Sequence, residues 1–182
     1  MFYTLATISG VLVILYGLIL LTRRKFMVKR GYLNIFIFFM SILNPTIKLM
    51  EMGYGFPLLF IGILPIFALV IIISRGRYTL TNINEKMVSS TLIDILEEKN
   101  LSYEEDKNTV ILEDYDSKRI SYRQSLNSVE INLTEILTLP FYKELKVELR
   151  TRIKAINLTV FPTLGCSLIL LGAIFLMILQ YL

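Results

Sequence analysis

The chain has 182 residues, of which 54% are hydrophobic and 19% are charged, and its formal net charge is +4. It contains no His and one Cys, so a disulfide within one chain is excluded. His-ligated or multi-Cys zinc and iron–sulfur sites within one protomer are excluded for the same reason. The small net charge argues against a nucleic-acid-binding protein, and nothing in the composition predicts a cofactor.

Long apolar runs dominate both ends of the chain. A helix that crosses about 30 Å of hydrocarbon needs roughly 20 mainly apolar residues. Four segments approach that length and predict transmembrane helices at about residues 5–22, 31–50, 56–74 and 156–182. The first run ends against Arg23 and Arg24 and has neither a basic start nor a cleavage site. It therefore predicts a retained anchor rather than a signal peptide.

The segment 31–50 is the least apolar of the four, because it contains Asn44, Pro45 and Lys48 and is followed by Glu51. The positive-inside rule decides its assignment. If all four segments cross, twelve basic residues flank the inner ends and Lys48 alone lies outside. If segment 31–50 stays inside, six of these basic residues lie inside and seven lie outside. The sequence therefore predicts a multi-pass cell-membrane protein with both termini outside and a cytoplasmic domain.

Polar residues within a membrane segment are candidates for a functional site. Asn44, Pro45 and Lys48 would form a polar notch in the second segment, and the alternative is a structural kink at Pro45. No acidic residue lies within the apolar runs, which argues against a proton relay.

Three pairs of glycines lie seven residues apart in the apolar segments. Seven residues are about two helical turns, so each pair places a flat patch on one helix face. Such patches favour close helix packing within the chain, and packing between the protomers of a homo-oligomer is the alternative. The residues are Gly10 and Gly17, Gly55 and Gly62, and Gly165 and Gly172.

Residues 77–155 change to mixed charge and short alternating runs, which predict a small domain of order β-α-β-β-β-α. Its first helix is expected to begin at the capping pair Asn82 and Glu85 and to end near Asn100. Pro140 lies where the first turn of the last helix should be. The predicted fold class is thus membrane α-helical, with four transmembrane helices and a small inserted α+β domain. The apolar stripe of the first domain helix is Val88, Leu92, Ile95 and Leu96.

Charge is divided within this domain. Residues 85–116 have a net charge of −7, and residues 117–155 have a net charge of +4. A basic stripe on the last helix is predicted to rest on a lipid bilayer with an anionic inner leaflet, and the alternative is that it only anchors topology. The acidic half is the predicted site for a cytoplasmic protein partner. The basic stripe consists of Lys143, Lys146, Arg150 and Lys154.

Carboxylate pairs are the only candidates for chemistry. Asp114 and Asp116 follow a predicted strand, as do the nucleophile and acid of haloacid-dehalogenase-type phosphatases, but the domain has no room for that larger fold. A calcium loop is disfavoured because Arg119 and Ser125 replace its Gly and Glu. A solvated turn is therefore the favoured interpretation, and no catalytic or metal site is predicted.

The favoured function is a non-catalytic protein whose α+β domain mediates protein interaction, sensing or regulation. A subunit of a small channel or transporter is the first alternative, but it needs a polar lining that only the second segment offers. A lipid-modifying enzyme is the second alternative, but it needs His or acidic residues near the membrane surface.

Overall fold

A computed structural model describes residues 2–157 and 160–181. Within these ranges, the side chains of residues 2–5, 39, 40, 43–45, 47, 48, 50, 56, 58 and 59 are not described. The chain forms two compact units. Unit 1 comprises Met1–Leu21, Gly31–Arg75 and Leu164–Leu182, and unit 2 comprises Thr22–Arg30 and Gly76–Thr163.

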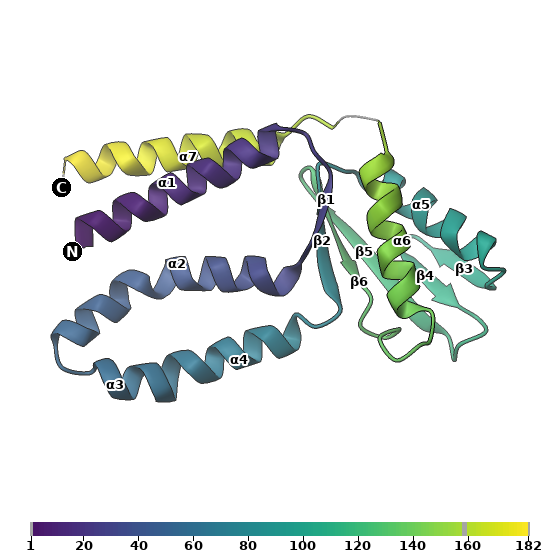
Figure 1. Ribbon diagram of the computed structural model, residues 1–182, viewed down its shortest axis with the longest axis horizontal. Coiled ribbons are helices and arrows are strands. Elements are labelled where there is room, and N and C mark those ends of the chain that lie inside the picture. Colours follow the sequence, from purple (N-terminus) through teal and green to yellow (C-terminus); the bar gives the residue numbers. More distant parts are fainter. Residues whose placement is uncertain (1, 158–159, 182) are drawn as a thin grey trace. The chain divides into compact units, whose positions relative to one another are not determined.

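Unit 1 is built from helices. Figure 1 shows α1 beside α7, and α2 beside α4. The first pair is joined by glycine contacts, and the second by the Asn34 amide, which donates to Ser74 Oγ at 3.0 Å. The bounds are α1 Phe2–Leu21, α2 Arg30–Glu51, α3 Gly55–Pro57, the π-helix η1 Leu58–Ile63, α4 Leu64–Ile73 and α7 Thr163–Gln180.

The prediction of four transmembrane helices is wrong. Among the described residues, one helix, Thr163–Gln180, is long and apolar enough to cross a membrane by length and composition. The apolar helical segments Ala6–Leu21 and Phe60–Ile73 are shorter. The predicted multi-pass cell-membrane localisation, with both termini outside and a cytoplasmic domain, is wrong for the same reason.

The error has two physical causes. The charge count treated Arg23–Arg30 as a membrane flank, but Phe26–Lys29 forms a strand of unit 2. The cations beside that strand have partners there: Lys25 Nζ donates to the Ile156 carbonyl at 2.9 Å, and Arg30 pairs with Glu130. In addition, the apolar run 56–74 is not one regular helix, because α3 and η1 interrupt it before α4.

Unit 2 contains an antiparallel sheet of order β1-β2-β6-β5-β4-β3, formed by six strands in the described part of the chain. The helices α5 (Glu85–Glu98) and α6 (Tyr142–Ala155) pack against each other and against the sheet. The strands are β1 Phe26–Lys29, β2 Arg77–Thr81, β3 Tyr103–Asp106, β4 Thr109–Leu112, β5 Lys118–Ser125 and β6 Ser128–Asn132.

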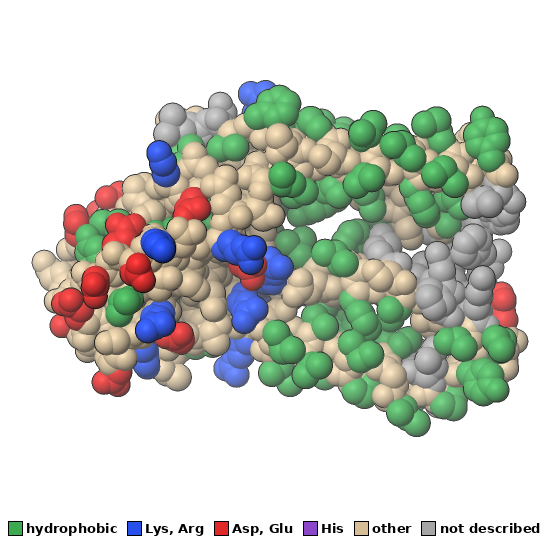
Figure 2. Space-filling model, turned by 180° about the vertical axis from the view of Figure 1, so that it is seen from behind, with side chains coloured by type: hydrophobic (Ala, Val, Ile, Leu, Met, Phe, Trp, Pro, Cys, Tyr) green, Lys and Arg blue, Asp and Glu red, His purple; other side chains and the backbone are tan. Residues whose placement is uncertain are grey.

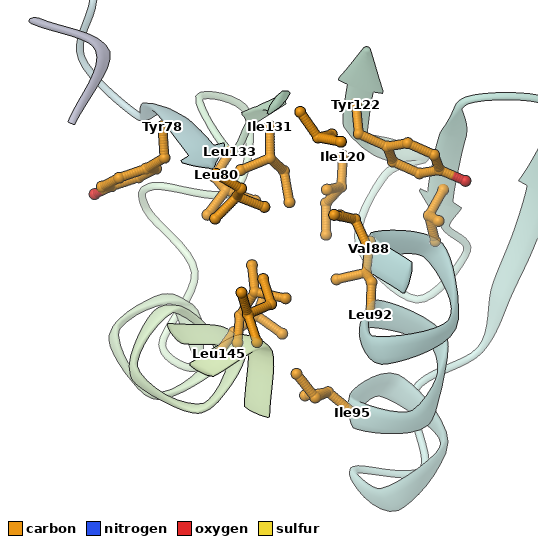
Figure 3. Packing of buried hydrophobic residues seen from close by; sticks show 14 of the residues in the cluster. Tyr78, Leu80, Val88, Leu92, Ile95, Ile120, Tyr122, Ile131, Leu133 and Leu145 are labelled. Atoms are coloured by element: carbon orange, nitrogen blue, oxygen red, sulfur yellow. The ribbon is translucent and has the colours of Figure 1, made fainter. Parts of the chain in front are cut away.

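The core of unit 2 lies between one face of this sheet and the two helices. Alternate strand residues such as Leu80, Ile120 and Ile131 face the apolar stripes of α5 and α6, represented by Leu92 and Leu145 (Figure 3). All five are fully buried. Because successive strand residues point to opposite faces, the residues between them lie on the face away from this core.

The order of elements in unit 2 differs from the predicted β-α-β-β-β-α. Residues 77–155 run β2-α5-β3-β4-β5-β6-α6, and β1 joins the sheet from a position before α2. The helix α5 is capped by Asn84, whose side chain accepts from the Met87 amide at 2.9 Å, and not by Asn82. Asn82 instead has φ of 56° and is buried. The predicted left-handed Asn100 after α5 is confirmed, with φ of 51°.

Candidate ligand-binding face of the sheet

The sheet face opposite the core is polar. Cross-strand register places Thr79, Glu130 and Arg123 in one row and Arg77, Asn132 and Ser121 in the next. Their intervening neighbours are the core residues of β2, β6 and β5, so these polar side chains share the other face. Figure 2 shows Lys and Arg side chains close together on part of unit 2, with acidic side chains concentrated elsewhere on it. We call the following set the polar face: Arg30, Arg77, Thr79, Ser121, Arg123, Glu130 and Asn132.

Two hollows open on the polar face and share Arg123 and Glu130. The larger has a volume of about 500 Å³ and is also lined by Arg77 and Asn132. The smaller has a volume of about 210 Å³ and is also lined by Thr79. Both exceed the roughly 30 Å³ that one water occupies in the liquid, so each has room for a small polyatomic group.

Charges on the polar face are unevenly paired. Arg30 Nη1 lies 2.5 Å from Glu130 Oε2, in a pair that is partly exposed. Arg77 and Arg123 have no hydrogen bond or ion pair with the described residues, and Arg77 Nε is buried. Within the set named above, three guanidinium groups therefore face one carboxylate, which leaves an excess of two positive charges. The same sheet face also carries Arg119, Glu104 and Asp106 toward β3.

Thr79 is the most buried polar residue of this face, with 8% of its surface exposed. Its hydroxyl oxygen is buried and has no hydrogen-bond partner in the part of the chain that the structure describes. A buried hydroxyl without a partner costs about 1–3 kcal/mol. The polar face thus carries donors whose hydrogen bonds are not made within unit 2.

The basic stripe predicted on the last domain helix lies on α6. Lys143, Arg150 and Lys154 are exposed, and Lys146 is half-buried, with its ammonium 5.8 Å from the centre of the Tyr142 ring. None of the four forms an ion pair with the side chains described. Contact of this stripe with an anionic bilayer stays a prediction.

Other charges of α6 join it to α5. Lys99 Nζ lies 3.0 Å from Glu144 Oε1 and 3.5 Å from Glu148 Oε2. Arg152 hydrogen-bonds Glu98 and lies 2.5 Å from Glu148 Oε1. The hydrogen bond from Arg152 lowers the pKa of Glu98, and the hydrogen bond with Glu144 raises the pKa of Lys99. These contacts link the C-terminal end of α5 to α6.

The acidic residues mostly serve local structure. Glu97 accepts from the Tyr103 hydroxyl at 2.9 Å, and Glu105 accepts from Ser89 Oγ at 2.8 Å. A hollow of about 540 Å³ lies beside Glu105, but that carboxylate also accepts from the Tyr122 hydroxyl at 3.2 Å. The prediction of a protein partner at the acidic half is untested by these contacts.

Asp114 and Asp116 lie in the turn between β4 and β5. Asp114 Oδ2 accepts from the Ser102 amide at 2.9 Å, and Asp116 is exposed with φ of 52°. Among the described residues, no group of three or more His, Cys, Asp or Glu could hold a metal ion. Both aspartates thus lie in a turn, and the absence of catalysis and of a metal site there stays a prediction.

The polar notch predicted at Asn44, Pro45 and Lys48 falls within α2, but these side chains lie outside the described residues. Asn34, on the same helix, donates to Ser74 of unit 1.

Four of the six glycines singled out by their spacing meet between α1 and α7. A Cβ added at Gly10 would lie 2.6 Å from Leu176, and one at Gly172 would lie 2.6 Å from Ile14. A Cβ at Gly17 would lie 3.0 Å from the Gly165 carbonyl, and one at Gly165 would lie 2.9 Å from the Gly17 carbonyl. These helices therefore approach closely along their glycine faces within one chain. Gly55 in α3 and Gly62 in η1 are half-buried, and their packing stays a prediction.

Sequence reasoning missed the polar face. The alternation of buried residues in β2, β5 and β6 was sufficient to place Thr79, Arg123 and Glu130 opposite their core neighbours. The alternation did not give the order of the strands in the sheet, because β2 lies beside β6 and not beside the next strand in sequence.

Comparison with protein-family models, with curated proteins and with solved structures found no match for this chain.

Proposed function

We propose that unit 2 is a non-catalytic recognition module, which senses or regulates by binding an anionic ligand or partner group on the polar face. The observation that carries the proposal is the set of unpaired donors there: the guanidinium groups of Arg77 and Arg123 and the hydroxyl of Thr79, all without partners among the described residues. Of these donors, the Thr79 hydroxyl and Arg77 Nε are buried, whereas Arg123 is exposed. Buried polar groups are nearly always hydrogen-bonded, and exceptions mark places where a ligand or water completes the structure.

The sign of the ligand follows from the charges. Arginine is always protonated and presents only donors, so two unpaired guanidinium groups attract an acceptor that carries negative charge. Glu130 offsets one of the three arginines and fixes Arg30 through their 2.5 Å contact. A neutral or cationic ligand would leave the remaining two positive charges uncompensated.

The absence of catalysis is part of the proposal and has separate support. The described residues near the polar face include no Cys, and Glu130, its one carboxylate, is paired with Arg30. A thiolate nucleophile is therefore not offered there, and the one carboxylate of the set is occupied by an ion pair. Lipid contact, which the sequence predicted for four apolar segments and for the basic stripe, is proposed among the apolar helices for α7, since that helix is mostly exposed and apolar.

Site-specific photo-crosslinking of the full chain tests which surface is used. A photoreactive side chain is introduced in turn at Ser121 on the polar face, at Glu104 in the acidic half and at Lys143 in the basic stripe. Adducts formed in cells that make the chain are identified by mass spectrometry. We expect adducts at Ser121 that decrease when Arg77 and Arg123 are both replaced by Gln.

Adducts only at Glu104 would instead favour the acidic half as the recognition surface and would overturn the proposal. The absence of catalysis is checked by incubating the purified chain with p-nitrophenyl phosphate and with p-nitrophenyl acetate. Turnover that disappears in the Arg123→Gln variant would contradict a non-catalytic role.

A further inference from the structure

The smaller hollow of the polar face has the features of a specific anion site. Its volume is about 210 Å³, and it lies over the row in which Thr79, Glu130 and Arg123 are cross-strand neighbours. Three antiparallel strands fix the backbone beneath it, so the spacing of these side chains is set by the sheet rather than by a loop.

Thr79 is the group that points to a ligand rather than to bulk solvent. More than nine-tenths of its surface is buried, it lines the hollow, and its hydroxyl has no partner in the described part of the chain. A Val at this position would fill similar space without an unpaired hydroxyl. In the structure the hydroxyl oxygen is covered, so an acceptor atom in the hollow reaches it once the Thr79 side chain rotates toward the hollow.

Arg123 supplies the charge for that acceptor. Arg123 is exposed, lines the same hollow and makes no ion pair with the described residues, although Glu130 lies opposite it in the ladder. Glu130 is already engaged by Arg30 at 2.5 Å. Arg77, in the adjoining hollow, adds positive potential without competing for the same oxygens.

We propose that this hollow binds the terminal phosphate of a phosphate monoester, or inorganic phosphate itself. A guanidinium donates two parallel hydrogen bonds to such a group, and the Thr79 hydroxyl donates a third. A terminal phosphate offers three strong acceptor oxygens and so matches these three donors, whereas a carboxylate offers only two oxygens. The inference rests on the proposed role of the polar face in recognition and adds the chemical class of the ligand.

Calorimetric titration of the full chain in a neutral detergent, with sodium phosphate as the probe, tests the site. Chloride is exchanged for phosphate at constant ionic strength, so that general screening is the same throughout. We expect saturable binding that Arg123→Gln weakens at least about tenfold, since a tenfold change corresponds to about the strength of one charge-assisted hydrogen bond. No saturable binding by the unchanged chain would overturn the proposal.

Two matched variants separate a site from general charge and from misfolding. Arg119 lies on the same strand and the same sheet face as Arg123 but lines neither hollow, so Arg119→Gln should leave phosphate binding unchanged. Thr79→Val should weaken phosphate binding about threefold to tenfold while thermal unfolding without phosphate occurs at the same or a higher temperature. Equal losses from Arg119→Gln and Arg123→Gln would show diffuse attraction and would refute the site.

The source of the phosphate is resolved by repeating the titration in lipid nanodiscs. If the natural ligand is a lipid headgroup, discs that contain phosphatidic acid should lower the apparent affinity for added phosphate relative to discs of phosphatidylcholine alone. If the ligand is soluble, both discs should give the same affinity. Adducts at Ser121 without phosphate binding would leave the recognition module standing and reject only this ligand class.

Discussion

Replacing Asn82 removes a buried polar contact that joins three separate segments of unit 2. The Asn82 amide nitrogen donates to the Arg24 carbonyl at 3.1 Å, just before β1. The Asn82 amide oxygen accepts from Asn127 Nδ2 at 2.7 Å, in the turn between β5 and β6. Asn82 and Asn127 are 1% and 2% exposed, so water cannot readily replace these bonds. We therefore expect Asn82→Ala to loosen β1 and the β5–β6 turn together.

The size of the effect follows from three contributions. Leaving the Arg24 carbonyl and the Asn127 amide without these partners costs about 1 kcal/mol each, at the low end for buried polar groups. The third contribution is backbone strain, because Asn82 has φ of 56°, which Asn tolerates and Ala pays about 1 kcal/mol to adopt. Asn82→Ala should lower the local free energy of opening by about 3 kcal/mol. Asn82→Gly, which lacks the strain, should lower it by about 2 kcal/mol.

Native-state hydrogen exchange of the full chain in mild detergent measures this change. Peptides that cover β1 and the β5–β6 turn should exchange about a hundredfold faster in Asn82→Ala, since 1.4 kcal/mol corresponds to a factor of ten. Asn100→Ala is the matched control, because Asn100 also has a left-handed φ of 51° but is exposed. That control should show the strain contribution alone, about 1 kcal/mol.

Two results would refute this reasoning. If peptides that cover β1 and the β5–β6 turn exchanged no faster in Asn82→Ala than in Asn100→Ala, the buried hydrogen bonds of Asn82 would contribute nothing to the local free energy of opening. If acceleration were confined to the β5–β6 turn, the contact between Asn82 and Arg24 would not hold β1 on the sheet.

Three further predictions address other contacts. Gly172→Leu should lower the thermal unfolding temperature of the full chain, because overpacking against Ile14 costs about 1–3 kcal/mol; unchanged melting would contradict the close approach of α1 and α7. Burial, with the hydrogen bond between the Tyr78 and Tyr142 hydroxyls, raises the pKa of Tyr78 above its ordinary 10.0, so the stability it gives is present below pH 10 and is lost as pH rises further. Titration of tyrosinate absorbance should therefore show ionisation at lower pH in Tyr142→Phe than in the wild type. The pKa of Glu98 is lowered from 4.5 by Arg152, so its contribution is present above pH 4.5 and is lost as pH falls through the folded-state pKa. Arg152→Gln should make the acid loss of stability shallower, as measured by urea unfolding at a series of pH values.

Local periodicity was enough to predict much of the core of unit 2. Val88, Leu92 and Ile95 repeat at helical spacing, and all three are buried in the face of α5 that packs on the sheet. Val110 and Leu112 alternate, and both are buried in β4. Such predictions succeed because burial of one face is decided by residues within a few positions of each other.

Residues at the ends of elements were less predictable. Asn82 and Asn84 both match the composition of a helix cap, but only Asn84 has the extended backbone that a cap requires. Asn82 has a left-handed backbone because its side chain is needed between Arg24 and Asn127. Which of the two asparagines caps α5 therefore depends on Arg24, almost sixty positions away in the sequence.

Local patterns along the chain were enough to locate the apolar helices, most of the α+β unit and its buried strand residues. Three features are visible only in the folded chain: Phe26–Lys29 pairs with β2, Arg30 pairs with Glu130, and Thr79 and Arg123 share a hollow. The fold also shows that one described helix is long and apolar enough for a membrane span. The physical reason is that periodicity and charge counts sum over neighbours along the chain, whereas strand pairing, ion pairing and helix continuity depend on which distant groups meet.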